Sequence, residues 1–329
     1  MHKNFVQFVK QLYNTDNYIP LHQPCFKGNE LSYLKECIDT TFVSSVGKFV
    51  DSFEAEVANF TGSKYAIATV NGTAALHIAL KLSGVTMGDE VITQSLSFVS
   101  ASNAIVYCQA EPVYIDIDKE TLGLSPDSLE AFLEENCEVR EDGICWNKKT
   151  NNIIRVCLPM HTFGFPAKIH RIREITKRYN ITLIEDAAES LGSLIRGKHT
   201  GTIGEIGILS FNGNKIITTG GGGMILTDNK DIAEDAKHLT TTAKLHHKWE
   251  FNHDKIGFNY RLPNINAALG LAQMENLNMF INNKRKIARS YQEWGDQNGL
   301  QFFIEPNHAR SNYWLNVALT ENKEARDKM

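Results

Sequence analysis

Residues 206–228 constrain the fold more than any other stretch of the sequence. Two short apolar runs, each with the length and composition of a buried strand, flank a turn that contains Lys215 and the four glycines Gly220–Gly223. The connection from Phe211 to Gly222 is too short for a crossover helix, so one of these two strands should be antiparallel in its sheet. The glycines would allow a close approach of backbone to a ligand or to a neighbouring chain.

Strand-like and helical segments alternate before this stretch. The strand-like runs are 65–70, 90–97, 111–118, 152–160, 181–188, 206–211 and 222–228, and helical patterns occupy 71–84, 98–109, 125–136 and 167–180. Ser125 is the expected cap of its helix, with Pro126 in the first turn. Seven strands separated mainly by helices predict an α/β fold with a seven-stranded, mostly parallel sheet.

The remaining segments suggest a second, smaller domain. An amphipathic helix is expected near the N-terminus, followed by helices at about 30–40 and around Phe53, Val57 and Phe60. Pro263 should open one long helix that joins the domains, and 301–306 and 312–319 resemble strands. We therefore expect a large domain over residues 1–275, and over 276–329 the connecting helix and a small C-terminal α/β domain that looks incomplete.

The bulk composition argues against several classes of protein. There are 34 basic and 38 acidic residues, a net charge of -4, which is unlike a nucleic-acid-binding protein. No run of about 18 apolar residues is present, so no membrane span is expected. The N-terminal residues lack the apolar core and cleavage site of a secretory signal. These features predict a cytoplasmic protein.

Cysteine and histidine spacing gives no support for a metal site. The six cysteines form no CxxC pair, and several lie in apolar surroundings, which predicts reduced, buried thiols. Eleven histidines are present without an HxxxH or HExxH pattern. We expect no metal.

Polar residues that can carry chemistry lie at the ends of the strand-like runs. Gly72 and Thr73 open a helix, which suits either a phosphate site or an ordinary cap. Asp186 ends an apolar strand, where a carboxylate is costly to bury without a partner such as a protonated pyridine nitrogen. Phe98 could cover a cofactor ring or belong to the core.

Ser210 and Lys215 complete this set. Ser210 can donate to a phosphate oxygen while the turn presents the amine of Lys215, which must be neutral to form an imine. A surface hairpin with a solvated lysine is the alternative. Because these groups all fall at strand ends, where α/β sheets bind ligands, we interpret Lys215 as the residue that holds pyridoxal phosphate as a Schiff base.

Several motifs resemble those of the nucleotide-sugar aminotransferases, a family of fold-type I pyridoxal-phosphate enzymes. They are NGTAALHIAL, SLSFVSASNAI, EPVYIDID, LIEDAAESLGS, SFNGNKIITTGGGG and GFNYRLPNINAALG, and the similarity runs from about residue 20 to 320. By this resemblance Lys215 and Asp186 are catalytic. The resemblance implies cofactor contacts at Gly72, Thr73, Phe98, Asp186, Glu189, Ser210, Lys215 and Asn259. Asn259 would reach the phosphate of a neighbouring subunit, which implies a homodimer with shared sites.

The resemblance also suggests a reaction. Glutamate would donate an amino group to a keto sugar carried on a nucleotide diphosphate, and His161, Arg261 and Lys27 are candidate substrate contacts. Gly221 stands where the family usually has glutamate, a variation that resembles enzymes acting on UDP-linked 4-keto-6-deoxy-N-acetylhexosamines in bacillosamine or legionaminic acid synthesis. A TDP-linked 3-keto sugar or a cyclitol ketone is the alternative substrate. A non-catalytic, truncated relative is the alternative of another class, because members of the family usually extend further.

Overall fold

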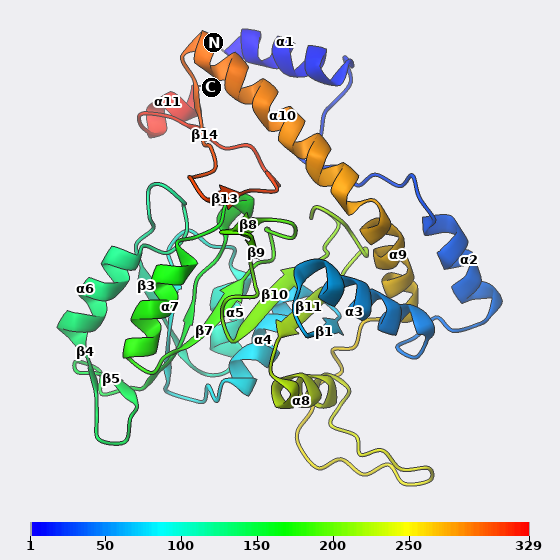
Figure 1. The fold of residues 1–329 in the computed structure, drawn as a ribbon, viewed down its shortest axis with the longest axis vertical. Coiled ribbons are helices and arrows are strands. Elements are labelled where there is room, and N and C mark those ends of the chain that lie inside the picture. The colour runs from blue at the N-terminus through cyan, green and yellow to red at the C-terminus, as the bar shows by residue number, and fades with distance from the viewer. Residues whose placement is uncertain (1, 329) are drawn as a thin grey trace.

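A seven-stranded sheet forms the centre of the molecule in the computed structural model, which describes residues 2–328 (Figure 1). Its strands are β1 (Tyr65–Thr69), β2 (Glu90–Gln94), β3 (Glu111–Ile115), β6 (Ile154–Leu158), β7 (Thr182–Asp186), β10 (Ile206–Ser210) and β11 (Gly223–Thr227). The order across the sheet is β1-β11-β10-β7-β6-β2-β3. Only β11 among these strands runs antiparallel to its neighbours. The predicted α/β sheet with one antiparallel strand is confirmed.

Helices cover both faces of this sheet (Figure 1). On one face lie α4 (Gly72–Leu82), α5 (Ser100–Tyr107) and α8 (Lys230–Thr240). On the other face lie α3 (Lys48–Thr61) and α9 (Asn264–Glu275) near β1 and β11, and α6 (Pro126–Asn136) and α7 (Ile169–Arg178) near β6. The helices α1 (His2–Tyr13) and α2 (Glu30–Asp39) precede them. Burial on both faces explains why the strands read as continuous apolar runs.

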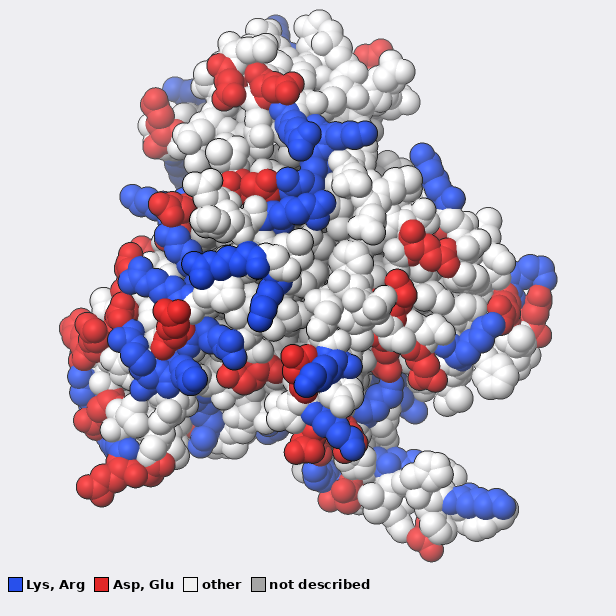
Figure 2. Space-filling model, viewed as in Figure 1, with Lys and Arg blue, Asp and Glu red and all other residues white. Residues whose placement is uncertain are grey.

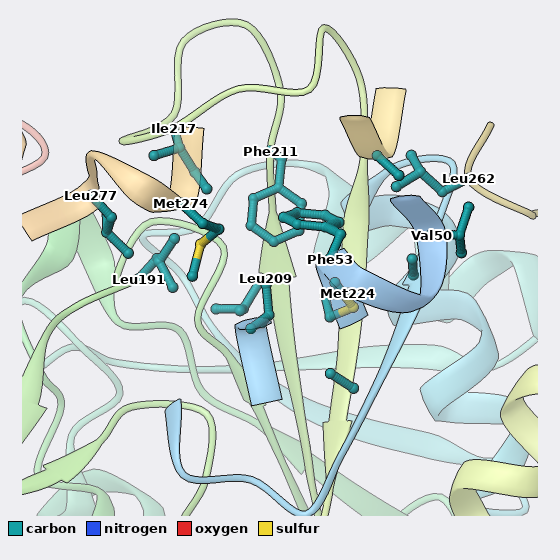
Figure 3. Packing of buried hydrophobic residues seen from close by; sticks show 14 of the residues in the cluster. Val50, Phe53, Leu191, Leu209, Phe211, Ile217, Met224, Leu262, Met274 and Leu277 are labelled. Atoms are coloured by element: carbon teal, nitrogen blue, oxygen red, sulfur yellow. The ribbon is translucent and has the colours of Figure 1, made fainter. Parts of the chain in front are cut away.

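Side chains on β10 and β11 alternate between the two cores. Ile208 and Ile225 point toward α4 and α8, whereas Leu209 and Met224 point toward α3 and α9. Figure 3 shows the second of these cores, in which Phe53 of α3 packs edge-on against Phe211 with ring centroids 5.0 Å apart. Because Phe211 directly follows β10, this packing fixes the point at which the turn toward Lys215 begins.

The expected long helix after Pro263 is in fact two helices. The first, α9, ends at Glu275, and after Asn276 the second, α10 (Leu277–Asn298), continues in another direction (Figure 1). The Asn276 side chain bonds the carbonyl of Ala272 at 3.4 Å, so the asparagine competes with the helical backbone. The break falls at the boundary that the sequence suggested between two domains, and that division stays a prediction.

The segment 312–319, which we expected to be a strand, is mostly irregular. Asn312 donates to the carbonyls of Glu189 and Leu191, and its Oδ1 accepts from the Trp314 N–H at 2.8 Å. These bonds tie the segment to the loop after β7, so only its end, β14 (Ala318–Leu319), pairs with β12 (Gln301–Phe302). The chain continues into α11 (Lys323–Asp327).

Several short strands lie outside the main sheet and were missed by the hydrophobic pattern. They are the hairpin β4 (Cys137–Val139) and β5 (Cys145–Asn147), and the group β8 (Leu194–Ile195), β9 (Lys198–His199) and β13 (Ala309–Arg310). Two or three residues are too few to show a period in the sequence.

Charges of both signs are interspersed on the face drawn in Figure 2. None of the helices within residues 2–328 is both long and apolar enough to span a bilayer. All six cysteines are free thiols, and five of them are buried, as the sequence predicted.

Candidate active site around Lys215

The candidate site lies at the carboxyl edge of the parallel strands. Since β1, β7 and β10 run in the same direction, their ends bring the Asn71–Thr73 turn, Asp186 and Ser210 to one edge of the sheet. This is where open α/β sheets bind ligands. The topology of the sheet therefore brings these residues to one edge, as the sequence predicted.

The start of α4 and the end of β10 form an anion-binding cradle. Asn71 caps the helix by accepting from the Ala74 N–H at 2.8 Å, and within residues 2–328 the N–H groups of Gly72 and Thr73 donate to no acceptor. A Cβ at Gly72 would lie 3.1 Å from Cβ and 3.3 Å from Oγ of Ser210. The helix start and the serine hydroxyl thus face one small space, which fits a phosphate group.

Gly223 explains how the helix start comes so close to the sheet. A Cβ there would lie 2.5 Å from the carbonyl carbon of Asn71 and 2.7 Å from the nitrogen of Gly72. Only a residue without a side chain allows this approach. Gly221 is different, because the nearest atom to a Cβ at that position is the Val70 oxygen at 3.9 Å.

Asp186 is a buried carboxylate with few internal partners. Its residue is 1% exposed, and within residues 2–328 only the Ala188 N–H donates to it, at 3.1 Å. Desolvation raises the pKa of Asp186, with the positive charge of Lys215 acting in the opposite direction. A carboxylate in this state is stabilised by a cationic partner, and the protonated ring nitrogen of pyridoxal phosphate is one that fits.

Lys215 lies against a carboxylate and an indole ring. Its Nζ is 3.4 Å from Oε1 of Glu189 and 4.2 Å from the ring centroid of Trp314, and its side chain is 12% exposed. Glu189 also accepts from the Phe163 N–H at 2.7 Å, and desolvation raises its pKa. The amine is therefore held inside the site, which excludes the solvated surface hairpin that the sequence left open.

Trp314 was not identified from the sequence. Its indole N–H donates to the carbonyl of Asn214 at 2.6 Å, directly before Lys215, and its backbone is fixed by Asn312. An aromatic ring under an ammonium group stabilises the position of that group. Because the tryptophan lies 99 residues after the lysine, only the tertiary structure could reveal the pair.

Four other predicted site residues are not drawn into this cluster. Phe98 follows β2 and is 62% exposed, so its ring is free to meet a ligand or another chain. Arg261 and Asn259 are exposed and bonded to each other, with Arg261 Nε 3.2 Å from Asn259 Oδ1. Lys27 is exposed in the loop before α2. Their assignments stay predictions.

His161 is not placed to contact a substrate, contrary to our expectation. It is 0% exposed; its Nδ1 accepts from the Ala167 N–H at 3.0 Å, so Nε2 carries the proton and donates to Glu185 at 2.9 Å. Both ring nitrogens are used inside the core. Glu185 in turn accepts from backbone N–H groups of the 201–204 loop, so the pair is structural.

Comparison with known proteins finds a family match and named relatives. Residues 24–329 match the model of the DegT/DnrJ/EryC1/StrS aminotransferase family. The chain is 38% identical over 313 residues to the GDP-perosamine synthase of Escherichia coli O157:H7, covering 95% of this chain and 80% of that protein. The enzyme of the same name from Vibrio cholerae is 36% identical over 305 residues, covering 93% and 78%.

A solved structure supports the fold. The X-ray structure of an aminotransferase from Psychrobacter cryohalolentis superimposes with a TM-score of 0.82 at 26% identity, covering 95% of this chain and 80% of that one. The similarity thus covers nearly the whole of this chain rather than the sheet alone.

Proposed function

Because the chain belongs to the DegT/DnrJ/EryC1/StrS family of pyridoxal-phosphate-dependent sugar aminotransferases, we propose that it transfers the amino group of glutamate to the keto carbon of a nucleotide-linked sugar. The observation that carries this proposal is the enclosed amine of Lys215, at the same sheet edge as the buried carboxylate of Asp186 and the cradle at Gly72 and Ser210.

Each of these groups has a distinct role in the proposed reaction. Pyridoxal phosphate, when bound, supplies an aldehyde that exchanges an amino group with substrates and a ring that withdraws electrons. The N–H groups of Gly72 and Thr73 and the hydroxyl of Ser210 would hold its phosphate. Asp186 would keep the ring nitrogen protonated, since the carboxylate lacks any other cationic hydrogen-bond donor within residues 2–328.

Lys215 is proposed to move the proton. Its Nζ, once neutral, would remove a proton from the α-carbon of the amino donor and deliver it within the same half-reaction, so that the amine is neutral again; in the second half-reaction it would run this transfer in reverse and protonate the sugar carbon that accepts the nitrogen. Glu189 lies 3.4 Å from this Nζ, so it can stabilise the ammonium form that arises within each half-reaction. The ring of Trp314 limits the directions in which the amine can move.

We propose C-4 of a 4-keto sugar as the site of amination. The names of the two relatives favour a GDP-linked sugar, whereas Gly221 led us to a UDP-linked N-acetyl sugar. The UDP-linked sugar is the weaker of these two inferences, because a side chain at position 221 would meet open space and packing within the chain does not require a glycine there. A TDP-linked 3-keto sugar and a cyclitol ketone have no such support.

We further propose that the enzyme is a homodimer with shared active sites. The loop between α8 and α9 extends away from the body of the molecule (Figure 1) and exposes Trp249, Phe251 and Ile256. Apolar side chains exposed together favour a protein partner, and Asn259 lies at the base of the same loop. A mixture of Lys215→Ala and Asn259→Ala chains should regain activity if Asn259 acts on the neighbouring site, because one site of each mixed dimer is then intact.

The free thiols suit a reducing compartment, so we propose the cytoplasm as the place of this reaction.

Replacement of Lys215 tests the catalytic assignment. Lys215→Ala should abolish the imine absorbance of the bound cofactor and the amination of GDP-, UDP- and TDP-linked keto sugars in the presence of glutamate. The exposed Lys149 provides the control, because it lies in the loop before β6, at the edge of the sheet opposite the candidate site: Lys149→Ala should keep both properties. Full turnover by the Lys215→Ala protein would refute the proposal.

A further inference from the structure

A second lysine, Lys284 of α10, lies beside the candidate site without an acidic partner. Its Nζ is 2.9 Å from Nδ1 of His22 and 2.9 Å from the carbonyl oxygen of Trp314. No carboxylate oxygen within residues 2–328 lies within the 4.0 Å that defines an ion pair with this atom. Desolvation lowers the pKa of Lys284 to about 8, so the amine is still mostly charged at neutral pH.

Among residues 2–328, these two bonds leave one donor of the ammonium group unused. An ammonium carries three N–H donors, and His22 and Trp314 accept two of them. His22 can accept because its imidazole is neutral: desolvation and the charge of Lys284 lower its pKa to about 4. The third donor and the uncompensated charge remain available to a ligand.

Lys284 and Lys215 line the same cavity. This space of about 100 Å³ is bounded by residues 22–25 before α2, by the turn at Lys215, and by Phe280 and Lys284 of α10. A partly desolvated cation at the wall of a cavity favours an anion inside it. The other wall carries the amine that we assign to catalysis.

The size of the cavity decides which anion fits. Sites that enclose a ligand as large as a nucleotide sugar have volumes of roughly 300–1,000 Å³. A cavity of about 100 Å³ accepts a carboxylate with a few attached carbons but excludes a diphosphate with its sugar and base. The amino donor is the substrate of the proposed function that carries such a group.

We propose that Lys284 binds a carboxylate of the amino-acid donor and so determines which amines the enzyme accepts. This inference rests on the proposed function, because it takes the donor to be an amino acid. The ammonium group of Lys284 would hold the carboxylate while the donor's α-carbon lies near Nζ of Lys215. The keto sugar, which has no carboxylate for this cavity, would bind independently of Lys284.

Lys284→Met tests the proposal in the holoenzyme, with Lys286→Met as the matched control on the exposed side of the same helix. Absorbance of the bound cofactor follows its conversion by glutamate alone, without any sugar. We expect Lys284→Met to raise the glutamate concentration for half-maximal rate by about 10- to 100-fold, the effect of a lost charge-assisted hydrogen bond. Lys286→Met should match the wild type, and the half-saturating concentration of the keto sugar should change in neither variant.

Thermal unfolding, taken together with the glutamate dependence, separates binding from a structural role. Lys284→Met removes the donor to His22 and to the Trp314 carbonyl, so the melting temperature should fall by a few degrees whether or not Lys284 binds substrate; a raised half-saturating glutamate concentration in protein that is still folded at the assay temperature supports the proposal. A lower melting temperature with unchanged dependence on glutamate would overturn the proposal and indicate that Lys284 only anchors Trp314. An unchanged melting temperature together with an unchanged dependence on glutamate would also overturn the proposal.

The outcome stays distinct from that of the proposed function. If glutamate converts the cofactor in a Lys284-dependent manner but no keto sugar is aminated, the sugar assignment fails and this inference stands. If glutamate does not react, calorimetric titration with 2-oxoglutarate replaces the rate measurement. Binding by the wild type that Lys284→Met weakens supports the proposal, and absence of binding by the wild type overturns it.

Discussion

The substitution Gly72→Ala tests whether the start of α4 binds a phosphate. The added methyl would lie 3.1 Å from Cβ and 3.3 Å from Oγ of Ser210. Carbon atoms prefer separations of roughly 3.5–4.0 Å, so the overlap is a few tenths of an ångström and small shifts can relieve it. Alanine is also favoured over glycine in a helix by roughly 0.5–1 kcal/mol. The stability of the cofactor-free protein should therefore change by less than about 1 kcal/mol.

Cofactor binding should respond much more strongly than stability. The methyl fills the space between the helix N–H groups and the Ser210 hydroxyl, so a bound phosphate loses at least one charge-assisted hydrogen bond. Such a bond contributes about 1.5–3 kcal/mol, which corresponds to a roughly 10- to 150-fold weaker affinity. Gly213→Ala is the control, because a Cβ at Gly213 has no atom within 4 Å.

Pyridoxal, which lacks the phosphate, makes the assay specific. Absorbance titrations of the wild type should show a strong preference for pyridoxal phosphate over pyridoxal. Gly72→Ala should lose most of this preference while its affinity for pyridoxal stays unchanged, and Gly213→Ala should behave as the wild type. If Gly72→Ala keeps the full preference, the phosphate lies elsewhere and the assignment of the cradle is wrong.

Three further predictions concern stability and the lysine turn. Burial lowers the pKa of His199 from the free value of 6.5 to about 4, so between these pH values the unfolded chain binds a proton that the folded chain does not. The contribution of neutral His199 to the free energy of unfolding, up to ~3 kcal/mol, is therefore complete above about pH 6.5 and is lost as the pH falls toward 4. His199→Gln should flatten the pH dependence of denaturant unfolding between these values. Phe53→Ala should lower the free energy of unfolding by about 3–5 kcal/mol in denaturant titrations, because the fully buried ring packs on Phe211; a loss below about 1 kcal/mol would contradict that packing. Trp314→Leu should slow the glutamate-dependent conversion of the cofactor about 3- to 30-fold, because the aromatic contact with Lys215 is lost. Trp314→Phe keeps an aromatic ring and should retain most of the rate. Equal rates in both variants would count against a role for the ring.

The sheet and its active edge could be predicted because local sequence determines both. Ser125 begins α6 as expected, and its hydroxyl accepts from the Ser128 N–H at 3.2 Å. The short connection after Phe211 required an antiparallel strand, and β11 is that strand. Because β7 and β10 are parallel neighbours, Asp186 at the end of β7 and Ser210 at the end of β10 must lie at the same edge of the sheet.

Residues whose role depends on contacts distant in sequence could not be assigned. His161 follows a strand at the correct edge, yet its ring turns into the core because Glu185, on the adjacent strand, accepts a hydrogen bond from its Nε2–H. Trp314 contacts Lys215 from the C-terminal segment, and Lys284 of α10 lines the same cavity as Lys215; nothing in their local sequence indicates this. Asn276 breaks a helix whose apolar pattern continues on both sides.

Nitrogen transfer itself is the most direct test of the proposed function. The purified protein, loaded with pyridoxal phosphate, would be incubated with glutamate carrying isotopically labelled nitrogen and with GDP- and UDP-linked 4-keto-6-deoxy sugars. The account predicts an amino sugar nucleotide whose mass rises by one unit with the labelled donor, and no such product from Lys215→Ala. Label that stays in glutamate with every sugar, although the cofactor is bound, would contradict the account.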